Sequence, residues 1–235
     1  MNKYLRSFFL FIIPSFILKK LKIGKVGFSI ILVDDWQSVP SARIGHFNFI
    51  KCQALHMEEH AQIGHLNLAM GYVKILLEKN SYIGNFNSFH AKKHKSKCYS
   101  LPYLRLHQSA KIMGHHYLDL IQSIDIGERS ILAGAFSQCW THSYIYGKEK
   151  HVRLDGTINI GSNCYIGASC ILLPGICIGD NITLGAGTTC SKSVTEQGVY
   201  VSSKLQYIPY DADERIKSLG KPMAIIDGVE RYKKE

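Results

Sequence analysis

The stretch INIGSNCYIGASCILLPGICIGDNITLGAGTTCSKSV, residues 158–194, decides the fold of this chain. A period of six runs through it, which fits neither the 3.6-residue helix nor a long strand with alternating faces. The period predicts short strands joined by tight turns, three to each triangular coil of a parallel β-helix. The apolar residues that recur every six positions are Ile160, Ile166, Leu172, Ile178 and Leu184.

The pattern continues upstream with slightly longer coils. Segments 44–48, 63–67 and 83–87 each read isoleucine, glycine, polar residue, apolar residue, asparagine, at intervals of nineteen and twenty residues. The final asparagines therefore recur at one corner of successive coils. We expect Asn48, Asn67 and Asn87 to stack inside that corner and to satisfy unpaired backbone groups.

We expect an all-β chain in three parts. Residues 1–25 form a short apolar and basic segment, residues 26–204 form the β-helix, and residues 205–235 form a cap with a short helix. A cap is expected because the end of a solenoid exposes unpaired strand edges. Loops interrupt the repeat at 89–110, which is basic, and at 143–153, which is polar, and such excursions often carry function.

The composition is that of a globular protein with one sizeable domain. Of the 235 residues, 46% are hydrophobic and 20% are charged. The formal net charge of +10 favours anionic partners, but no recognisable nucleic-acid motif accompanies it, so we expect no nucleic-acid partner. The seven cysteines contain no CxxC pair, and we interpret them as small apolar residues in a reducing cytosol. No metal is expected.

The N-terminal residues 4–22 combine an apolar stretch with basic flanks. The apolar part, 7–18, is shorter than the roughly 20 residues that a transmembrane helix needs. No small-residue cleavage site of a signal peptide is evident. Two interpretations stay open: a segment that lies on the membrane surface, or one that packs on the protein or on a neighbouring subunit. We expect a cytoplasmic protein, either free or peripheral on the inner face of the membrane.

Residues 156–192 resemble the hexapeptide-repeat O-acetyltransferases, which include galactoside, maltose and many polysaccharide acetyltransferases. The resemblance rests on the ordered run of an IG-x-N corner, an IG-x coil, Pro174-Gly175, IGDN and GAG. Weaker similarity covers residues 44–201, about two thirds of the chain. The resemblance implies a left-handed β-helix, an exception to the usual right-handed crossover. It also implies a homotrimer with active sites between neighbouring subunits.

The reaction implied by this resemblance moves an acetyl group from acetyl-CoA to a hydroxyl. A hydroxyl is a weak nucleophile at neutral pH and needs a general base, a task that suits histidine. The family places its catalytic histidine where a coil gives way to a loop, and His142 matches that position. Asp119, about one coil upstream, is similar to the family's orienting group, and Asn85 is a weaker candidate for positioning the acceptor. A purely corner-capping role stays open for both.

The resemblance also implies the residues that contact acetyl-CoA. Small residues let the pantetheine arm lie against the coil, where free N–H groups can bond its amides, and a lysine can bind a phosphate. Where the family carries a Gly-x-Pro stretch and then a basic residue, residues 201–206 lack the proline and the later basic residue, although Lys204 could substitute, so the nucleotide end is undefined. The matching positions are Tyr165, Gly167, Ala168, Gly185, Ala186, Ser191 and Lys192.

The acceptor is expected beside His142. Trp140 can stack on a sugar ring, and Thr141 and His116 are the other candidates for acceptor contacts. We expect a sugar hydroxyl of a bacterial surface polysaccharide or of its precursor. A free sugar, a nucleotide-linked sugar and an antibiotic stay open.

Three alternatives compete with this hypothesis. A zinc site of the carbonic-anhydrase type would use stacked histidines such as His46 and His65, but Asn85 interrupts the series. A covalent acyl-enzyme would use Cys139, three residues before His142, although nothing indicates an activated thiolate there. A non-catalytic solenoid that only binds a ligand is the third.

Overall fold

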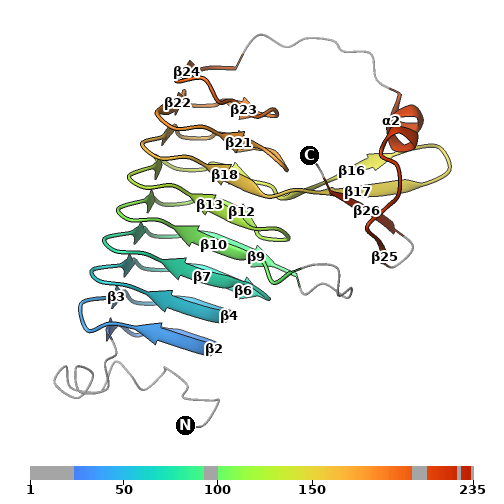
Figure 1. Ribbon diagram of the computed structural model, residues 1–235. Helices are drawn as coiled ribbons and strands as arrows, with labels where there is room; N and C mark the ends of the chain where they lie inside the picture. The colour runs from blue at the N-terminus through green and yellow to red at the C-terminus, as the bar shows by residue number, and fades with distance from the viewer. Residues whose placement is uncertain (1–23, 93–99, 203–210, 227–228, 234–235) are drawn as a thin grey trace.

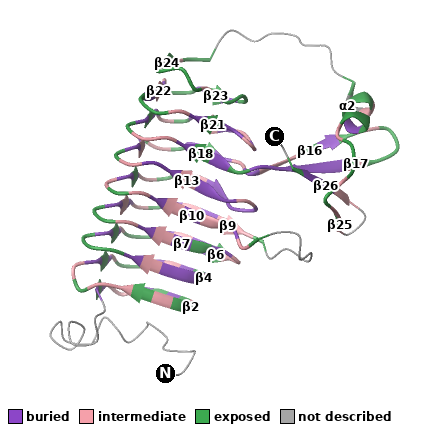
Figure 2. Ribbon diagram, viewed as in Figure 1, coloured by how far each residue is buried: buried purple, intermediate pink, exposed green. Residues whose placement is uncertain are grey.

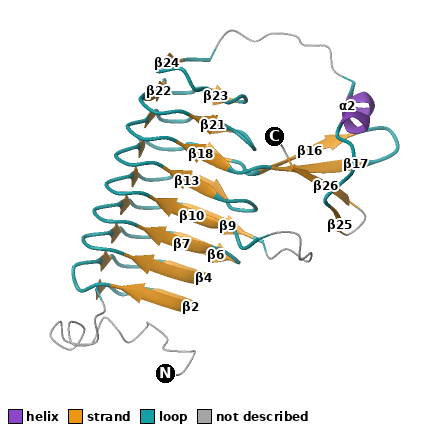
Figure 3. Cartoon of the chain, viewed as in Figure 1, coloured by secondary structure: helices purple, strands orange, loops and turns teal. Residues whose placement is uncertain are grey.

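The computed structural model describes residues 24–92, 100–202, 211–226 and 229–233. Within these ranges the chain winds upward as a parallel β-helix, and a small separate sheet projects from its side (Figures 1 and 3). All strand pairs recorded within the β-helix are parallel, because each coil returns to the same face one strand spacing higher. The predicted β-helix is therefore confirmed.

The β-helix is a three-sided prism, and its first face is a sheet of nine short strands. Registers across this sheet align the repeated apolar positions, so that Ile44, Ile63 and Ile83 stack on one another. The strands are β1 Lys25–Val26, β3 Arg43–Ile44, β5 Gln62–Ile63, β8 Tyr82–Ile83, β11 Lys111–Ile112, β14 Ile131–Leu132, β19 Tyr165–Ile166, β22 Ile182–Leu184 and β24 Gly198–Tyr200.

The second and third faces form one continuous sheet of thirteen strands, because two long strands, β2 Ile30–Ser38 and β4 Phe49–Met57, run through the corner between them. The second face continues with β6 Leu68–Gly71, β9 Ser88–Ala91, β12 Tyr117–Asp119, β15 Gln138–Cys139, β20 Ile171–Leu172 and β23 Thr189–Cys190. The third face continues with β7 Lys74–Leu77, β10 Tyr103–Leu106, β13 Ile124–Ile126, β18 Ile158–Ile160 and β21 Cys177–Ile178.

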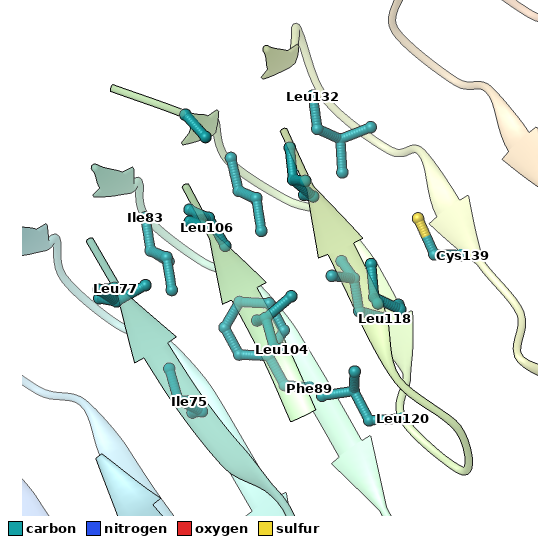
Figure 4. Close-up of a cluster of buried hydrophobic side chains, with 14 of the residues drawn as sticks. Ile75, Leu77, Ile83, Phe89, Leu104, Leu106, Leu118, Leu120, Leu132 and Cys139 are labelled. Carbon is teal, nitrogen blue, oxygen red and sulfur yellow. The ribbon is translucent and has the colours of Figure 1, made fainter. Parts of the chain in front are cut away.

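One apolar core fills the prism from end to end. Figure 4 shows its middle, where side chains such as Ile83, Leu104, Leu118 and Cys139 from all three faces point toward one another. Burial of apolar side chains is worth about 25 cal/mol per Å² of apolar surface. The six-residue period matters because it returns an apolar side chain to this core on every face.

The asparagine ladder is confirmed. The side chain of Asn67 accepts a hydrogen bond from the backbone N–H of Asn87 and donates one to the carbonyl of Gly84, at 2.9 and 2.8 Å. In the same way, the side chain of Asn48 accepts from the backbone N–H of Asn67, and that of Asn87 accepts from the backbone N–H of His116, each at 2.9 Å. Each rung thereby satisfies backbone groups of the next coil that the turn would leave unpaired inside the protein.

Next to this ladder, large apolar side chains stand on the outside of the corner between the first and second faces. Their backbones adopt the left-handed conformation, which bulky residues rarely use. They are also largely exposed: 62% for Phe47, 45% for Leu66, 49% for Phe86 and 66% for Phe136. We call these four residues the corner column.

The polar excursion at 143–153 is an ordered antiparallel hairpin of β16 His142–Tyr146 and β17 His151–Asp155. Two strands near the C-terminus, β25 Ala224–Ile226 and β26 Val229–Lys233, extend it to a four-stranded sheet. The helix α2 Ala212–Ser218, the short helix expected within 205–235, packs on the same sheet. We call this unit the side sheet.

The expectation of an end cap at 205–235 differs from this packing. In the described part of that segment, α2 and β26 cover the hairpin, while β24 and β23 at the end of the β-helix lie apart from them (Figure 1). The physical reason is that the hairpin has an apolar side of its own to bury. Ile216 of α2 and Tyr232 of β26 pack on that side, and β26 pairs in parallel with the edge of β17.

The expected loop at 89–110 is shorter than the sequence indicated. Strand β9 continues to Ala91 and β10 begins at Tyr103, so the coil is regular on both sides of the interruption. Residues 1–23 lie outside the described residues, and with them nearly all of the N-terminal segment predicted at 1–25. In the part of the chain that the structure describes, no helix has the length and apolarity to cross a bilayer.

Candidate functional site

The site forms where the second face gives way to the hairpin. Nδ1 of His142 lies 2.8 Å from Oδ2 of Asp119, which is 4% exposed at the end of β12. A carboxylate only accepts hydrogen bonds, so Nδ1 carries the proton and Nε2 keeps a free lone pair. The side chain of His142 is 24% exposed, and in the described residues no hydrogen bond occupies Nε2. The pair is thus arranged as an oriented base.

Thr141 holds Asp119 in place. The Thr141 backbone N–H donates to Oδ2 of Asp119 at 3.0 Å, and its hydroxyl lies 2.8 Å from the same oxygen. The hydroxyl also accepts from the backbone N–H of Gln122 at 3.0 Å. Because Thr141 is fully buried, it supports Asp119 from behind and does not contact an acceptor, which corrects the role expected from the sequence.

Aromatic rings flank His142 on both sides. Trp140 lies 6.4 Å from His142 between ring centroids, and Tyr117 lies 5.0 Å from Trp140. His90 stacks on Tyr117 at 5.3 Å, and Tyr144 meets His142 edge-on at 5.8 Å. Burial and the charge of Asp119 raise the pKa of Tyr117, so its hydroxyl stays protonated. Rings of this kind present flat apolar faces with polar edges, which suit stacking on sugars.

A hollow of about 470 Å³ opens on the second face next to Asp119. Its lining includes His90, Lys51 and Lys92. Lys51, Met70, His90 and Asp119 occupy one row across adjacent strands. The hollow therefore places cationic side chains beside the rings that lead to His142.

The rest of the side sheet, formed by α2, β25 and β26, supports the hairpin that begins at His142. Its apolar core joins Ile145, Val152 and Leu154 of the hairpin to Ile216 of α2 and Tyr232 of β26. Figure 2 shows β17 largely in the colour of buried residues, whereas most of β16 is intermediate or exposed. The C-terminal segment therefore helps to position the site.

The expected cofactor residues Gly167, Ala168, Gly185 and Ala186 lie in the corner between the first and second faces. A Cβ on Gly167 would stand 2.6 Å from the backbone N of Ala186, so no larger residue fits there. In lower coils a side chain caps the N–H at the equivalent position, as His65 does for His46 at 2.9 Å. Among the described residues, no hydrogen bond occupies the N–H of Ala168 or Ala186. This wall fits a ligand that carries amides.

The other cofactor candidates lie elsewhere. Ser191 and Lys192 follow β23, two strands above β15, so they are at the same edge of the second face as His142 and about 10 Å higher. Both are exposed. Tyr165 is half exposed on the first face, so the structure does not bring it together with His142 on one chain.

Two further candidates have structural roles. His116 is 1% exposed, and its Nδ1 accepts from the backbone N–H of Ser137 at 3.2 Å, which makes it the rung above Asn87 in the asparagine ladder. Burial lowers its pKa to about 4, and no acceptor can reach it. Asn85 caps the backbone N–H of His65 at 2.7 Å, outside the same corner and away from His142.

The alternative chemistries gain no support from the geometry. Cys139 points into the core, and burial raises its pKa to about 12, so it is not an activated thiolate (Figure 4). His46 and His65 stack at 5.6 Å, but the Nδ1 of each accepts from a backbone N–H. In the residues that the structure describes, no group of three or more potential ligands is arranged around a metal position.

Comparison with known proteins agrees with the repeat. Residues 157–192 match the family described as bacterial transferase hexapeptide (six repeats). This stretch consists of transferase-type hexapeptide repeats. The predicted resemblance and the left-handed parallel β-helix are confirmed at this level.

Solved structures were compared with this chain as well, and one of them reaches a TM-score above 0.5. The polysialic acid O-acetyltransferase OatWY aligns with a TM-score of 0.52 at 14% identity, over 78% of this chain and 87% of that one, which shows a shared fold. The polySia-specific acetyltransferase NeuO aligns at 12% identity over 78% and 76%, with a TM-score of 0.39. A maltose O-acetyltransferase from Clostridium difficile 630 aligns at 18% identity over 58% and 66%, with a TM-score of 0.31.

Sequence reasoning missed several residues around His142. Tyr117 was detectable, because it stands two positions before Asp119 and so shares its side of the strand. Arg231, whose Nη1 lies 3.5 Å from the hydroxyl of Tyr144, was not detectable. It is 87 residues from Tyr144 in the sequence and comes close because β26 pairs with β17.

Proposed function

We propose that the protein is an acyl-CoA-dependent O-acetyltransferase that acts on a sugar hydroxyl. The observation that carries the proposal is the 2.8 Å contact between Nδ1 of His142 and the buried carboxylate of Asp119, beside partly exposed aromatic rings. The hexapeptide match and the open amide N–H groups of Ala168 and Ala186 support an acyl-CoA donor. Acetyl-CoA would supply the acyl group as an activated thioester.

His142 acts as the general base in this proposal. Its Nε2 takes the proton of the acceptor hydroxyl as that oxygen attacks the thioester carbon, and the C–O bond forms. Asp119 stabilises the imidazolium that results, because its carboxylate accepts a hydrogen bond from Nδ1–H. The C–S bond then breaks, and the proton on Nε2 passes to the departing sulfur. Every atom and proton is accounted for by His142, the hydroxyl and the thioester.

The acceptor that fits best is a sugar of a bacterial surface polysaccharide or of its precursor. Trp140 and Tyr117 offer ring faces beside the base, and the hollow with Lys51 and Lys92 continues along the second face. Rings in line with the base suit a glycan longer than one residue.

The corner column supports a homotrimer. The column exposes bulky apolar side chains to water and holds their backbones in a conformation that such residues rarely adopt. Contiguous exposed apolar surface usually marks an interaction site. We propose that neighbouring subunits cover this column and complete the donor site, and that the enzyme works in the cytoplasm. Contact of residues 4–22 with the membrane stays a proposal, since those residues lie outside the described part.

The test is acetyl-CoA consumption against a panel of acceptor glycans. His142→Ala should lower turnover by about 10²–10⁴-fold while acetyl-CoA binding and assembly persist. His60→Asn is the matched control, because His60 is exposed at a distant corner with φ 58°, a conformation that asparagine tolerates. If the His142 variant transfers acetyl groups at the wild-type rate, the proposed base is wrong.

A further inference from the structure

The side sheet carries a row of side chains on the same side as His142. Tyr144 pairs with Arg153 across the hairpin, and Arg153 pairs with Arg231 of β26. Paired residues share a side of the sheet. The opposite side holds Ile145, Leu154 and the rest of the apolar core. Arg153 and Arg231 therefore face the side from which His142 projects.

The two arginines differ in how their charge is balanced. Arg153 makes a two-point contact with Asp155, with nitrogen to oxygen distances of 2.6 and 2.7 Å, so these two charges compensate each other. Arg231 has no carboxylate partner among the described residues, and its Nε is buried without a hydrogen bond. Its Nη1 lies 3.5 Å from the hydroxyl of Tyr144, the long limit for a hydrogen bond.

Arg231 is nevertheless 94% buried, since its exposed fraction is 6%. Burying a guanidinium without a counter-charge carries a large desolvation penalty, which a bound anion would offset. The guanidinium reaches Tyr144, whose ring lies 5.8 Å from that of His142. Residues two apart on a strand are separated by about 7 Å, so an anion on Arg231 would stand about one sugar ring from the base.

We propose that Arg231, with the hydroxyl of Tyr144, forms an anion subsite that binds a carboxylate of the acceptor next to the hydroxyl that is acetylated. A planar guanidinium fork matches a carboxylate better than a lysine ammonium does. The acceptor class is then an acidic glycan, which carries a uronic acid or another sugar acid. This inference rests on the proposed acetyl transfer and narrows its acceptor.

The first test measures transfer to acidic glycans and to their carboxyl-reduced counterparts. Wild-type protein should acetylate the acidic form at least tenfold more efficiently in kcat/KM. Arg231→Met should lower kcat/KM for the acidic form ten- to a hundredfold, mainly through KM, because a charge-assisted hydrogen bond is lost. Arg231→Lys should recover part of it, and the exposed Arg215→Met should match the wild type.

The second test measures binding alone. Glucuronate should raise the melting temperature of the wild type but not of Arg231→Met, and the uncharged methyl ester of glucuronate should affect neither. Equal shifts in both proteins, or none in either, would overturn the subsite. So would a rise in KM for acetyl-CoA in place of the acceptor, because the bound anion would then be a phosphate of the donor. Absence of transfer to every glycan would contradict the proposed function, while the binding result still decides the subsite.

Discussion

Nδ1 of His142 and Oδ2 of Asp119 lie 2.8 Å apart although 23 residues separate them along the chain. The β-helix makes this contact because β12 and β15 are neighbours in one sheet, with Leu118 paired with Cys139. Asp119 is the last residue of its strand, and His142 begins the hairpin just beyond the next one. The contact therefore depends on one coil-to-coil step and on the support that Thr141 gives.

Asp119→Asn tests the orienting role. The variant removes the charge that stabilises the imidazolium and no longer enforces the Nδ1–H tautomer, so kcat should fall by about 10²-fold or more while KM changes little. Steady-state kinetics with a glycan acceptor measure both.

Asp125→Asn is the matched control, because Asp125 also contacts a histidine, His107 at 2.7 Å, but on the third face. It should leave kcat unchanged. Equal losses in the two variants would mean that the effect is on general stability.

Thr141→Val tests the support behind Asp119. Valine has the same shape but cannot donate to Asp119, which is buried, or accept from the N–H of Gln122, which is part-buried. We expect the free energy of unfolding to drop by about 1–3 kcal/mol and kcat to fall with it. Thr141→Ser keeps the hydroxyl and should restore both, as urea unfolding and kinetics will show. A valine variant with wild-type kcat would show that Asp119 needs no such support.

The fold followed from the sequence because a repeat reports the same local geometry many times. The six-residue period in 158–194 and the asparagine that ends each early coil are independent signals for the same corners, and both are met in the structure. His142 and Asp119 were found by resemblance, and their contact agrees with a spacing of about one coil.

The residues that were misassigned depend on where a side chain points. His116 follows a turn like its neighbours and reads as a candidate ligand contact, yet the coil directs it inward as the rung after Asn87. Arg231 could not be predicted as a site residue, because nothing in the sequence of β26 specifies that this strand pairs with β17. Long-range strand pairing outside the repeat has no local signature.

His116→Asn tests the ladder and its acid sensitivity. Burial lowers the pKa of His116 to about 4 from an unfolded value near 6.5. The unfolded chain thus binds a proton that the folded chain does not, so stability is complete above pH 6.5 and falls as the pH drops toward 4. The loss is about 3 kcal/mol in this window.

Asparagine at this position can accept from the N–H of Ser137 as Asn87 does from His116. The variant should therefore match the wild type at pH 7.5 and become more stable than it at pH 4.5. Urea unfolding at the two pH values measures the difference. If both proteins lose stability in parallel on acidification, His116 is not the group that titrates.

Ile216→Ala tests whether the C-terminal segment positions the hairpin. Ile216 is 3% exposed against the apolar side of β16 and β17, so its truncation should cost about 2–5 kcal/mol locally. The hairpin that starts at His142 would then lose its backing, and we expect faster hydrogen exchange in residues 142–155 together with a several-fold fall in kcat. The β-helix has a separate core and should exchange as in the wild type. Ile225→Ala, at a residue that is 66% exposed in the same segment, is the control and should change neither. Unchanged exchange in the hairpin of the Ile216 variant would show that β16 and β17 hold their position without this support.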